Sequence, residues 1–415
     1  MDVPGASAHF YNKSYKTKVR MLENKTKILY ILSFLGGMQG NIVASLFVVF
    51  GLSLGFSIAY VGLLLGASRL SQFIFEIPTG IFADTYGRKK SILLCYFFSL
   101  FFYLIYFFGS DFYLLLLGSV IGGFALSFMS GAFEALAVDS LALSDKEQFR
   151  NKVFVRLTVI TTLGFIAGGL VGSAIAYFDL RYIWLFQAAA AIFALILGWR
   201  FLKEKFFPRE ATDKKENVVK ILIRKIKEPA AAILRDKKIP TMFAVSILIS
   251  SASAFYLVSW PIIFKEILTI PVYYFGLISS AAGLFYLIGS FLAEKFSLTR
   301  GAFNTVLFSL ILMGLFYFIF GLSKSLVFSL LSFIAIDFFN GGFSPLFYSF
   351  LNGIIPSSRR ATILSFYSLV EGGSSGLGEM MAGKLIIIFG APMVIFFPPL
   401  LIFIALFSFS RAKKT

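Results

Sequence analysis

The feature that most constrains this chain is a series of long apolar segments separated by short charged ones. A transmembrane helix needs about 20 apolar residues, and the chain offers about twelve such segments. We expect helices at 28–51, 57–83, 91–109, 112–143, 153–177, 181–200, 239–264, 272–296, 301–321, 325–354, 362–389 and 391–410. Since 58% of the residues are hydrophobic and only 14% are charged, a soluble domain has no way to hide so much apolar surface. The sequence predicts an all-α membrane protein.

The basic residues are distributed unevenly between the two ends of these helices. Of the 38 Lys and Arg residues, 31 lie in the two termini and the even-numbered loops, when Lys295 at the end of its helix is counted with the loop that follows. The odd-numbered loops hold three, at Arg181, Lys265 and Lys324. Basic residues accumulate on the cytoplasmic side of membrane proteins, so the net charge of +17 reflects topology rather than nucleic-acid binding. We expect a bacterial inner-membrane protein with both termini and the central loop in the cytoplasm.

The residue types needed for most enzyme chemistry are scarce in this chain. Cys95 is the single cysteine, which excludes a disulfide within the chain and a metal site built from cysteines. His9 is the single histidine and lies in the N-terminal tail, so no histidine relay crosses the membrane. No nucleotide-binding loop and no Ser/His/Asp set appear. We therefore expect no enzyme activity, no catalytic residues, no metal and no cofactor.

A basic segment at 201–238 interrupts the apolar pattern and holds twelve Lys or Arg residues. Part of it mixes apolar and basic residues at helical spacing, so it would either lie on the anionic inner leaflet or form a solvated linker. The first apolar segment lacks a cleavage pattern and is too long for a signal-peptide core. The predicted domains are a cytoplasmic tail, a six-helix bundle, a basic linker, a second six-helix bundle and a short cytoplasmic tail, at 1–27, 28–200, 201–238, 239–410 and 411–415.

The two halves of the chain resemble each other when they are offset by 210 positions. Gly131 and Phe133 then meet Gly341 and Phe343, and further matches fall at equivalent helices and loops. A duplicated six-helix unit is one of the known transporter architectures. We therefore expect two pseudo-symmetric six-helix bundles.

The short loop after the second predicted helix carries a distinctive motif, GIFADTYGRKKS at 80–91. In this motif Gly80 allows a neighbouring helix to approach closely. Asp84 is placed to cap a helix start and to attract Arg88. Gly87 permits a tight reversal of the chain. The plainer interpretation is a charged loop that follows the distribution of basic residues described above.

This motif closely resembles the signature of the major facilitator superfamily, in which a Gly, an Ala-Asp pair and a Gly-Arg-Lys run lie between helices 2 and 3. Segments at 76–80 and 130–140 resemble a bacterial efflux-type subgroup. The resemblance implies two bundles around a central cavity that opens alternately to either side. It also implies that the loop connects the two halves when the protein faces outward. That conformational latch would consist of Gly80, Asp84, Gly87 and Arg88.

Two positions depart from the pattern of proton-coupled members of this superfamily. Many such members carry an arginine in helix 4, four residues before a glycine, where this chain has Gly118 before Gly122. Drug–proton antiporters usually show a Gly-Pro pair in helix 5, where this chain has GFIAGGLVG at 164–172. These departures bear on drug–proton antiport more than on transport. The glycine series itself fits plain helix–helix packing.

Several charged residues fall inside the predicted helices, where each costs about 2.5–3.5 kcal/mol and suggests function. At a rise of 1.5 Å per residue, Glu76 lies roughly 12 Å from the cytoplasmic end of its helix. Glu134 and Glu371 each lie roughly 14 Å from theirs. These three carboxylates share one layer near the middle of a ~30 Å core. The intramembrane candidates are Arg69, Glu76, Glu134, Asp139, Asp337, Glu371 and Glu379.

Polar residues recur on single faces of three predicted helices, and such faces avoid lipid. The three sets are Arg69, Gln72 and Glu76; Ser127, Ser130 and Glu134; and Asp337, Asn340, Ser344 and Tyr348. We assign substrate binding and proton coupling to Arg69, Gln72, Glu76, Glu134, Asp337 and Glu371, with Arg69 as the expected partner of Glu134. The alternative is an arginine–carboxylate pair that only holds helices together.

The sequence thus predicts a secondary active transporter that works by alternating access. Titratable carboxylates in an apolar setting suggest protons as the coupling ion, and we expect efflux of a small amphiphilic molecule by antiport with protons. The 53 Phe residues are compatible with a Phe-lined cavity. Expected partners are the substrate and membrane lipids, and the protein is expected to be a monomer. Two alternatives stay open: import or export of a specific metabolite, siderophore or lipid, and a receptor-like membrane protein that transports nothing.

Overall fold

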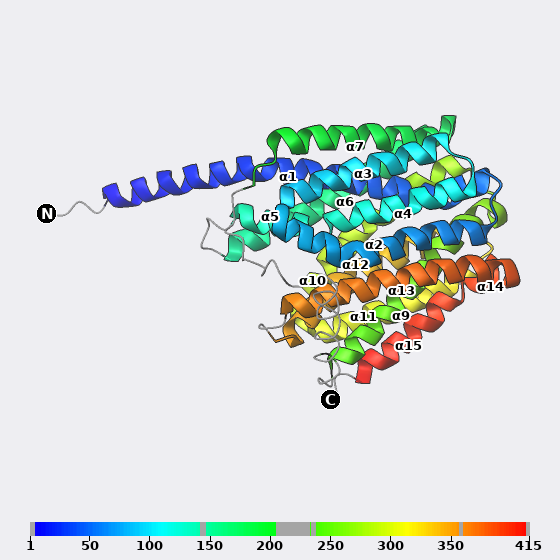
Figure 1. Cartoon of the computed structure of the whole chain (residues 1–415). Coiled ribbons are helices and arrows are strands. Elements are labelled where there is room, and N and C mark those ends of the chain that lie inside the picture. Colours follow the sequence, from blue (N-terminus) through cyan, green and yellow to red (C-terminus); the bar gives the residue numbers. More distant parts are fainter. Residues whose placement is uncertain (1–4, 142–146, 205–232, 234–237, 357–359, 412–415) are drawn as a thin grey trace.

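The computed structural model describes residues 5–141, 147–204, 233, 238–356 and 360–411, and every regular element in these ranges is a helix (Figure 1). The first half contains α1 Gly5–Ser53, α2 Ile58–Tyr86, α3 Arg88–Phe108, α4 Phe112–Met129, α5 Ala132–Leu141, α6 Glu147–Phe178 and α7 Tyr182–Phe201. The second half contains α9 Ile239–Ile262 with its π-helical extension η1 Ile263–Ile267, η2 Val272–Tyr274, α10 Phe275–Arg300, α11 Ala302–Leu322, α12 Leu326–Ile354, α13 Arg360–Phe389, α14 Ala391–Val394 and α15 Phe397–Arg411.

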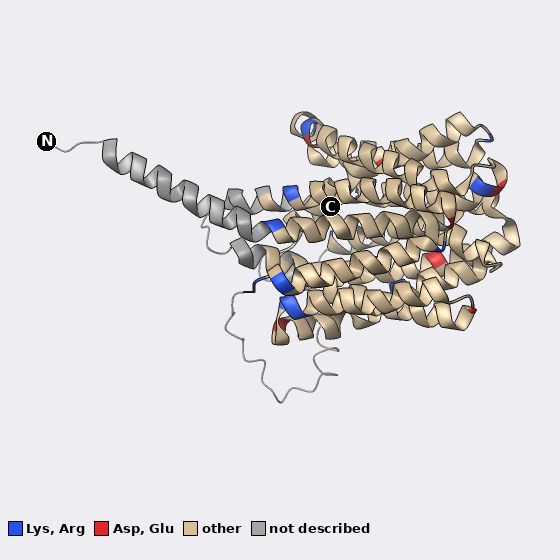
Figure 2. Ribbon diagram, turned by 90° about the horizontal axis from the view of Figure 1, so that it is seen from above, with Lys and Arg blue, Asp and Glu red and all other residues tan. Residues whose placement is uncertain are grey.

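Eleven helical segments in the described ranges are long and apolar enough to cross a membrane. They include Lys27–Ser53 of α1, and the segments that follow it are 18 to 29 residues long. The other predicted span corresponds to α13, which has 30 residues but contains Glu371, Glu379 and many Gly and Ser residues. Long stretches of the helices lack charged residues (Figure 2). The prediction of an all-α, multi-pass membrane fold is therefore confirmed.

The predicted helix at 112–143 is not continuous. α4 ends at Met129, and α5 begins at Ala132. Gly131 between them has a φ of +69°, a left-handed conformation that glycine adopts without steric cost. The prediction of one continuous helix was wrong, so helical spacing no longer places Glu134 on one face with Ser127 and Ser130.

The last predicted helix, at 391–410, is also divided. A single turn, α14, is followed by α15, whose first turn contains Pro398 and Pro399. Proline lacks a backbone N–H and therefore fits the first turn of a helix, where that donor has no intrahelical partner. The two prolines therefore mark the start of α15, although the apolar composition of 391–410 predicts a single helix.

The helices pack in the same pattern in both halves. In the first half α1 lies along α6 and α2 along α4, and in the second α9 lies along α13 and α10 along α12. The halves meet where α2 packs on α13 and where α6 packs on α10. This repeated arrangement confirms two pseudo-symmetric helical bundles. The predicted linker at 201–238 lies almost entirely outside the described residues.

The two halves are in backbone contact at the end of the bundle opposite the chain termini (Figure 1). A Cβ atom added to Gly62 would lie 2.7 Å from the carbonyl oxygen of Glu379, and one added to Gly66 would lie 2.6 Å from that of Gly376. Gly169 of α6 approaches the backbone of Gly276 of α10 in the same way. α2 and α10 begin at this end, and α6 and α13 finish there. The molecule is therefore closed at the end away from its termini.

Candidate functional site

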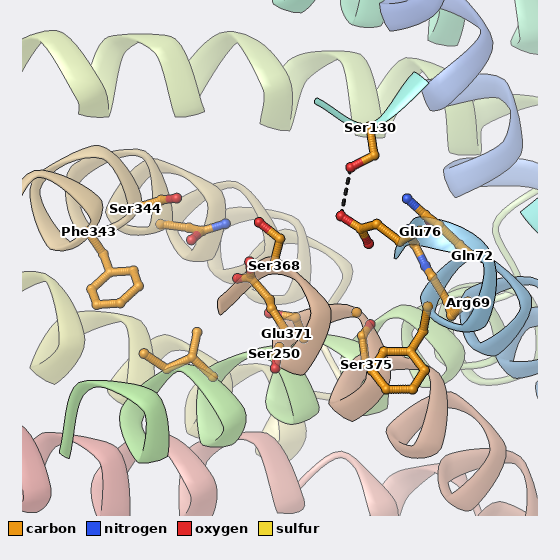
Figure 3. Close-up of a pocket in the computed structure, with 15 residues that line it drawn as sticks. Arg69, Gln72, Glu76, Ser130, Ser250, Phe343, Ser344, Ser368, Glu371 and Ser375 are labelled. Atoms are coloured by element: carbon orange, nitrogen blue, oxygen red, sulfur yellow. Dashed lines mark hydrogen bonds between the residues drawn. The ribbon is translucent and has the colours of Figure 1, made fainter. Parts of the chain in front are cut away.

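A cavity of about 400 Å³ lies between the two halves, and we call it the central cavity (Figure 3). Residues from α2, α9, α12 and α13 form its walls, together with Ser130 between α4 and α5. The lining residues are Arg69, Gln72, Phe73, Glu76, Ser130, Ile249, Ser250, Ser253, Asn340, Phe343, Ser344, Ser368, Glu371, Gly372 and Ser375. Two are phenylalanines and most are polar, so the cavity is not lined mainly by Phe.

Four of the six predicted site residues meet at this cavity. Arg69, Gln72 and Glu76 come from α2, and Glu371 comes from α13 of the other half. Figure 3 shows Glu76 and Glu371 entering the cavity from different helices. The polar face predicted for α2 therefore lines the space between the halves.

Glu76 is held in place from the break between α4 and α5. The Ser130 hydroxyl donates a 2.8 Å hydrogen bond to Oε1 of Glu76. One turn further along α2, Thr79 Oγ1 donates to the backbone carbonyl of Ser127 at 2.9 Å. The end of α4 thus fixes α2 at two points. Glu134 itself lies in the first turn of α5, just beyond Gly131, and its side chain is outside the described part of the structure.

Arg69 pairs with a carboxylate of the opposite half. Its Nε atom lies 3.5 Å from Oε1 of Glu379, and the Arg69 side chain is 47% exposed whereas Glu379 is fully buried. The structure thus gives Arg69 a partner other than the predicted Glu134. The reason is that α2 and α13 pack closely at their glycines, and this contact brings Glu379 of α13 next to Arg69 of α2. Gly62 and Gly66, spaced by four, are the sequence signal for that contact.

Asp337 is not among the residues that line the central cavity. It lies on α12 close to Tyr256 of α9 and Tyr317 of α11, whose rings are 4.9 Å apart. Asn340 and Ser344 of the same predicted face do reach the cavity. The structure therefore places Asp337 beside α9 and α11 of the second bundle and not among the residues that line the central cavity.

The loop between α2 and α3 has the predicted tight reversal, with Gly87 at a φ of +107°. The cap of α3 is different from the predicted one. The Glu204 carboxylate accepts hydrogen bonds from the backbone N–H groups of Arg88, at 2.7 Å, and Lys89, at 3.1 Å. A Cβ atom at Gly87 would lie 2.7 Å from Oε2 of Glu204. A carboxylate is favourable at a helix N-terminus, where free N–H groups and the helix dipole attract negative charge.

Asp84 therefore does not cap α3. Its side chain is exposed, and the described residues include no ion pair between Asp84 and Arg88. Sequence reasoning missed Glu204 because it lies at the start of a segment dominated by Lys and Arg. It is one of six acids in the segment 201–238, and nothing in the local sequence indicates that this one contacts a loop more than a hundred positions earlier.

Comparison with known proteins agrees with this architecture. A profile of the Major Facilitator Superfamily matches residues 29–260, which is more than half of the chain. The chain belongs to the Major Facilitator Superfamily. Because this is a family of transporters rather than enzymes, membership also confirms the expectation that the protein is not an enzyme.

Curated relatives match the chain over part of its length. It is 26% identical over 215 residues to the uncharacterized MFS-type transporter YxaM of Bacillus subtilis, covering 51% of this chain and 52% of that protein. It is 27% identical over 215 residues to Multidrug resistance protein 2 of Bacillus subtilis, covering 49% and 52%. The chain thus spans about half the length of the curated relatives that it matches.

Solved structures resemble the chain over nearly its whole length. The nucleoside transporter NupG superposes with a TM-score of 0.75 at 16% identity, covering 94% of this chain and 98% of that one. A bacterial homolog of the human lysosomal transporter Spinster, in an inward-facing and unoccupied conformation, gives 0.74 at 15% identity, covering 95% and 97%. At such identities the likeness shows the fold alone.

Proposed function

We propose that this member of the superfamily is a secondary active transporter that exports a small amphiphilic molecule in exchange for protons. The observation that carries the proposal is the central cavity, in which carboxylates of both halves, Glu76 and Glu371, face one space. The cavity lies at the interface between the bundles, whose backbones meet closely at Gly62, Gly66 and Gly169 near one end. A rocking motion of the bundles about the cavity would open that end and close the other.

The charges of the cavity support proton coupling. Arg69 is engaged by Glu379, whereas Glu76 has only the Ser130 hydroxyl as a side-chain partner among the described residues. Glu371 also has no basic partner there. Carboxylates in a membrane interior are costly unless they bind a proton or a cationic group, so these two are the leading coupling candidates. Glu134 and Asp337 remain candidates of the same proposal.

The lining supports a substrate with hydrogen-bonding groups and a smaller apolar part. Six serines, Asn340 and Gln72 offer donors and acceptors, while Phe73 and Phe343 offer apolar contact. One relative is named Multidrug resistance protein 2, and removal of a compound from the cell is one way for a transporter to confer resistance to it. The second candidate function is transport of a specific polar metabolite, which the predominantly polar lining favours. NupG, of similar fold, is named a nucleoside transporter.

We further propose that the protein lies in a bacterial inner membrane as a monomer, with its termini and the linker at 201–238 in the cytoplasm. The uneven distribution of Lys and Arg supports this orientation. The closed end of the molecule then faces outward, and the structure is inward-facing. The proposed latch of Gly80, Asp84, Gly87 and Arg88 would engage only in the outward-facing state, which agrees with the exposure of Asp84.

Proteoliposomes test the function directly. Substrates found by metabolite accumulation in a deletion strain are assayed for uphill transport driven by a pH gradient and for exchange at equal concentrations. We expect Glu76→Gln to abolish uphill transport but to retain exchange, because exchange requires no net proton movement. The same two assays on Glu371→Gln and Glu134→Gln identify the coupling carboxylate. Absence of both activities in the wild-type protein would exclude transport, leaving a receptor-like role.

A further inference from the structure

A second cavity of about 420 Å³ lies in the second half of the molecule, where residues of α10, α11 and α12 line it. We call it the outer groove. Its lining residues are Gly289, Leu292, Ala293, Lys295, Phe296, Thr299, Thr305, Phe308, Ser309, Phe338, Phe339 and Gly342. None of them lines the central cavity. Leu292, Phe296 and Phe308 are each about half exposed, so the groove opens on the outer surface of the bundle.

Small residues create the hollow. α10 and α12 touch where Gly289 meets the backbone of Phe338. Beyond this contact the facing residues are Ala293 and Gly342, and a Cβ atom at Gly342 would lie 3.2 Å from Cβ of Ala293. Aromatic rings form the walls, with the Phe296 and Phe308 centroids 5.8 Å apart. The interior of the groove is therefore apolar and shaped by the helix packing itself.

One cation stands at the rim of this apolar space. Lys295 is exposed and lies five residues before Arg300, where α10 ends, which is about 8 Å along the helix axis. It shares a helical face with Leu292 and Thr299, which also line the groove. The neighbouring acid, Glu294, is not among the lining residues, and the described residues include no ion pair of Lys295. The basic end of the groove lies on the same side of the bundle as the chain termini.

An apolar groove with a cation at its membrane-surface end fits an anionic amphiphile. An uncharged apolar ligand would leave Lys295 unused, and free phosphate would leave the apolar walls uncovered. Basic pockets between transmembrane helices on the cytoplasmic side bind anionic lipid head groups. We propose that the outer groove binds one anionic phospholipid, with an acyl chain along Leu292 and Phe308 and the phosphate at Lys295. This proposal does not depend on which substrate the central cavity takes.

The test compares lipid retention by four variants. The protein is purified in mild detergent with an equimolar mixture of phosphatidylglycerol and phosphatidylcholine, and the bound lipid is counted by native mass spectrometry. Lys295→Gln removes the charge, and Leu292→Trp fills the mouth of the groove. The matched controls are Lys324→Gln, an exposed lysine at the opposite end of the bundle, and Leu298→Trp, an 83% exposed position on α10 outside the groove.

We expect one phosphatidylglycerol per wild-type protein and at least fivefold less in Lys295→Gln and Leu292→Trp, with both controls unchanged. Equal retention in all five proteins would mean annular lipid only and would overturn the proposal. Equal retention of phosphatidylcholine would overturn selection of the head group. Displacement by inorganic phosphate alone would show a phosphate site without a lipid. Because the two groove variants act by different means, a folding defect in one, detected by size-exclusion chromatography, leaves the other to decide.

Discussion

The two interfaces that close the molecule occupy equivalent places in the repeat, yet they use different chemistry. Where α2 meets α13, backbone contacts at Gly62 and Gly66 are accompanied by the ion pair of Arg69 and Glu379. Where α6 meets α10, the backbone contact of Gly169 and Gly276 is accompanied by neutral hydrogen bonds. Duplication therefore accounts for the shape of both contacts and not for their polar groups.

The neutral interface is built around Asn41 of α1. Asn41 is fully buried, donates from Nδ2 to the carbonyl of Phe165 at 2.7 Å and accepts from the Ser279 hydroxyl at 2.8 Å. Ser280 donates to the carbonyl of Ile166 at 2.7 Å. These bonds need no charge and no solvent. The charged interface borders the central cavity, so its strength depends on what the cavity holds, and we infer that it responds to substrate and protons whereas the neutral one does not.

The largest expected effect is an asymmetry between the two partners of the charged interface. Arg69→Met leaves the buried Glu379 carboxylate unpaired, whereas Glu379→Gln leaves a half-exposed arginine that water in the cavity can solvate. Breaking a fully buried pair costs about 3–5 kcal/mol, and the exposure of Arg69 reduces this to roughly 1–3 kcal/mol. We expect Arg69→Met to lower the apparent unfolding temperature more than Glu379→Gln, with recovery in the double variant. Equal losses in both single variants, without recovery, would contradict the pairing.

The next effect compares the glycine contacts of the two interfaces. Gly169→Ala and Gly66→Ala each place a methyl group against the backbone of the opposite half, and overpacking of this kind costs about 1–3 kcal/mol. The closed end should therefore open in both variants. It should open more in Gly169→Ala, where the methyl group also meets Asn41 at 2.6 Å. Gly36→Ala, with no atom within 4 Å of the added group, is the control.

Spin labels provide the measurement. Tyr113→Cys and Met393→Cys are exposed positions on opposite halves at the closed end, and the buried native thiol is removed by Cys95→Ser. Double electron–electron resonance should show a longer distance population in Gly169→Ala and Gly66→Ala than in Gly36→Ala. If the three distributions coincide, the glycine contacts do not hold this end closed.

The main features of this fold were predictable because they are local. Apolar segments of membrane-spanning length predict helices wherever they occur, and the motif around Gly87 predicts a tight loop. The break at Gly131 was missed because glycine is common inside transmembrane helices, so its presence does not distinguish a break from a packing contact. Proline at 398 and 399 is a stronger signal, but the apolar run on both sides concealed it.

The site was predictable only as far as single helices determine it. The face of Arg69, Gln72 and Glu76 follows from helical spacing, and the structure places all three at the central cavity. The partner of Arg69 does not follow, because it depends on which helix of the other half packs on α2. Asp337 illustrates the same limit. Its position along α12 follows from the sequence, but the sequence does not tell that it lies beside α9 and α11.

The next comparison lies within the neutral interface. Asn41→Ala removes two buried hydrogen bonds and leaves the Phe165 carbonyl and the Ser279 hydroxyl without this partner, at a cost of about 1–3 kcal/mol. Ser173→Ala removes one bond, to the backbone N–H of Leu277, and should cost about 1 kcal/mol. Thermal unfolding in detergent ranks the two variants. We expect neither to change the pH dependence of transport, which separates them from the charged pair.

The smallest effect concerns the loop between α2 and α3, far from both interfaces. Glu204→Gln keeps the shape of the side chain but removes the negative charge from the N-terminus of α3, which typically costs about 0.3–1 kcal/mol. Asp84→Asn should leave the stability of this state unchanged, because Asp84 is exposed and does not cap α3.

If Asp84 belongs to a latch of the opposite state, Asp84→Asn should instead slow turnover while substrate binding survives. Glu204→Gln, which changes a charge that contacts this loop, is then the matched control, with lower stability and nearly normal turnover. The reverse outcome, a stability loss in Asp84→Asn together with equal losses of binding and turnover, would assign Asp84 a folding role.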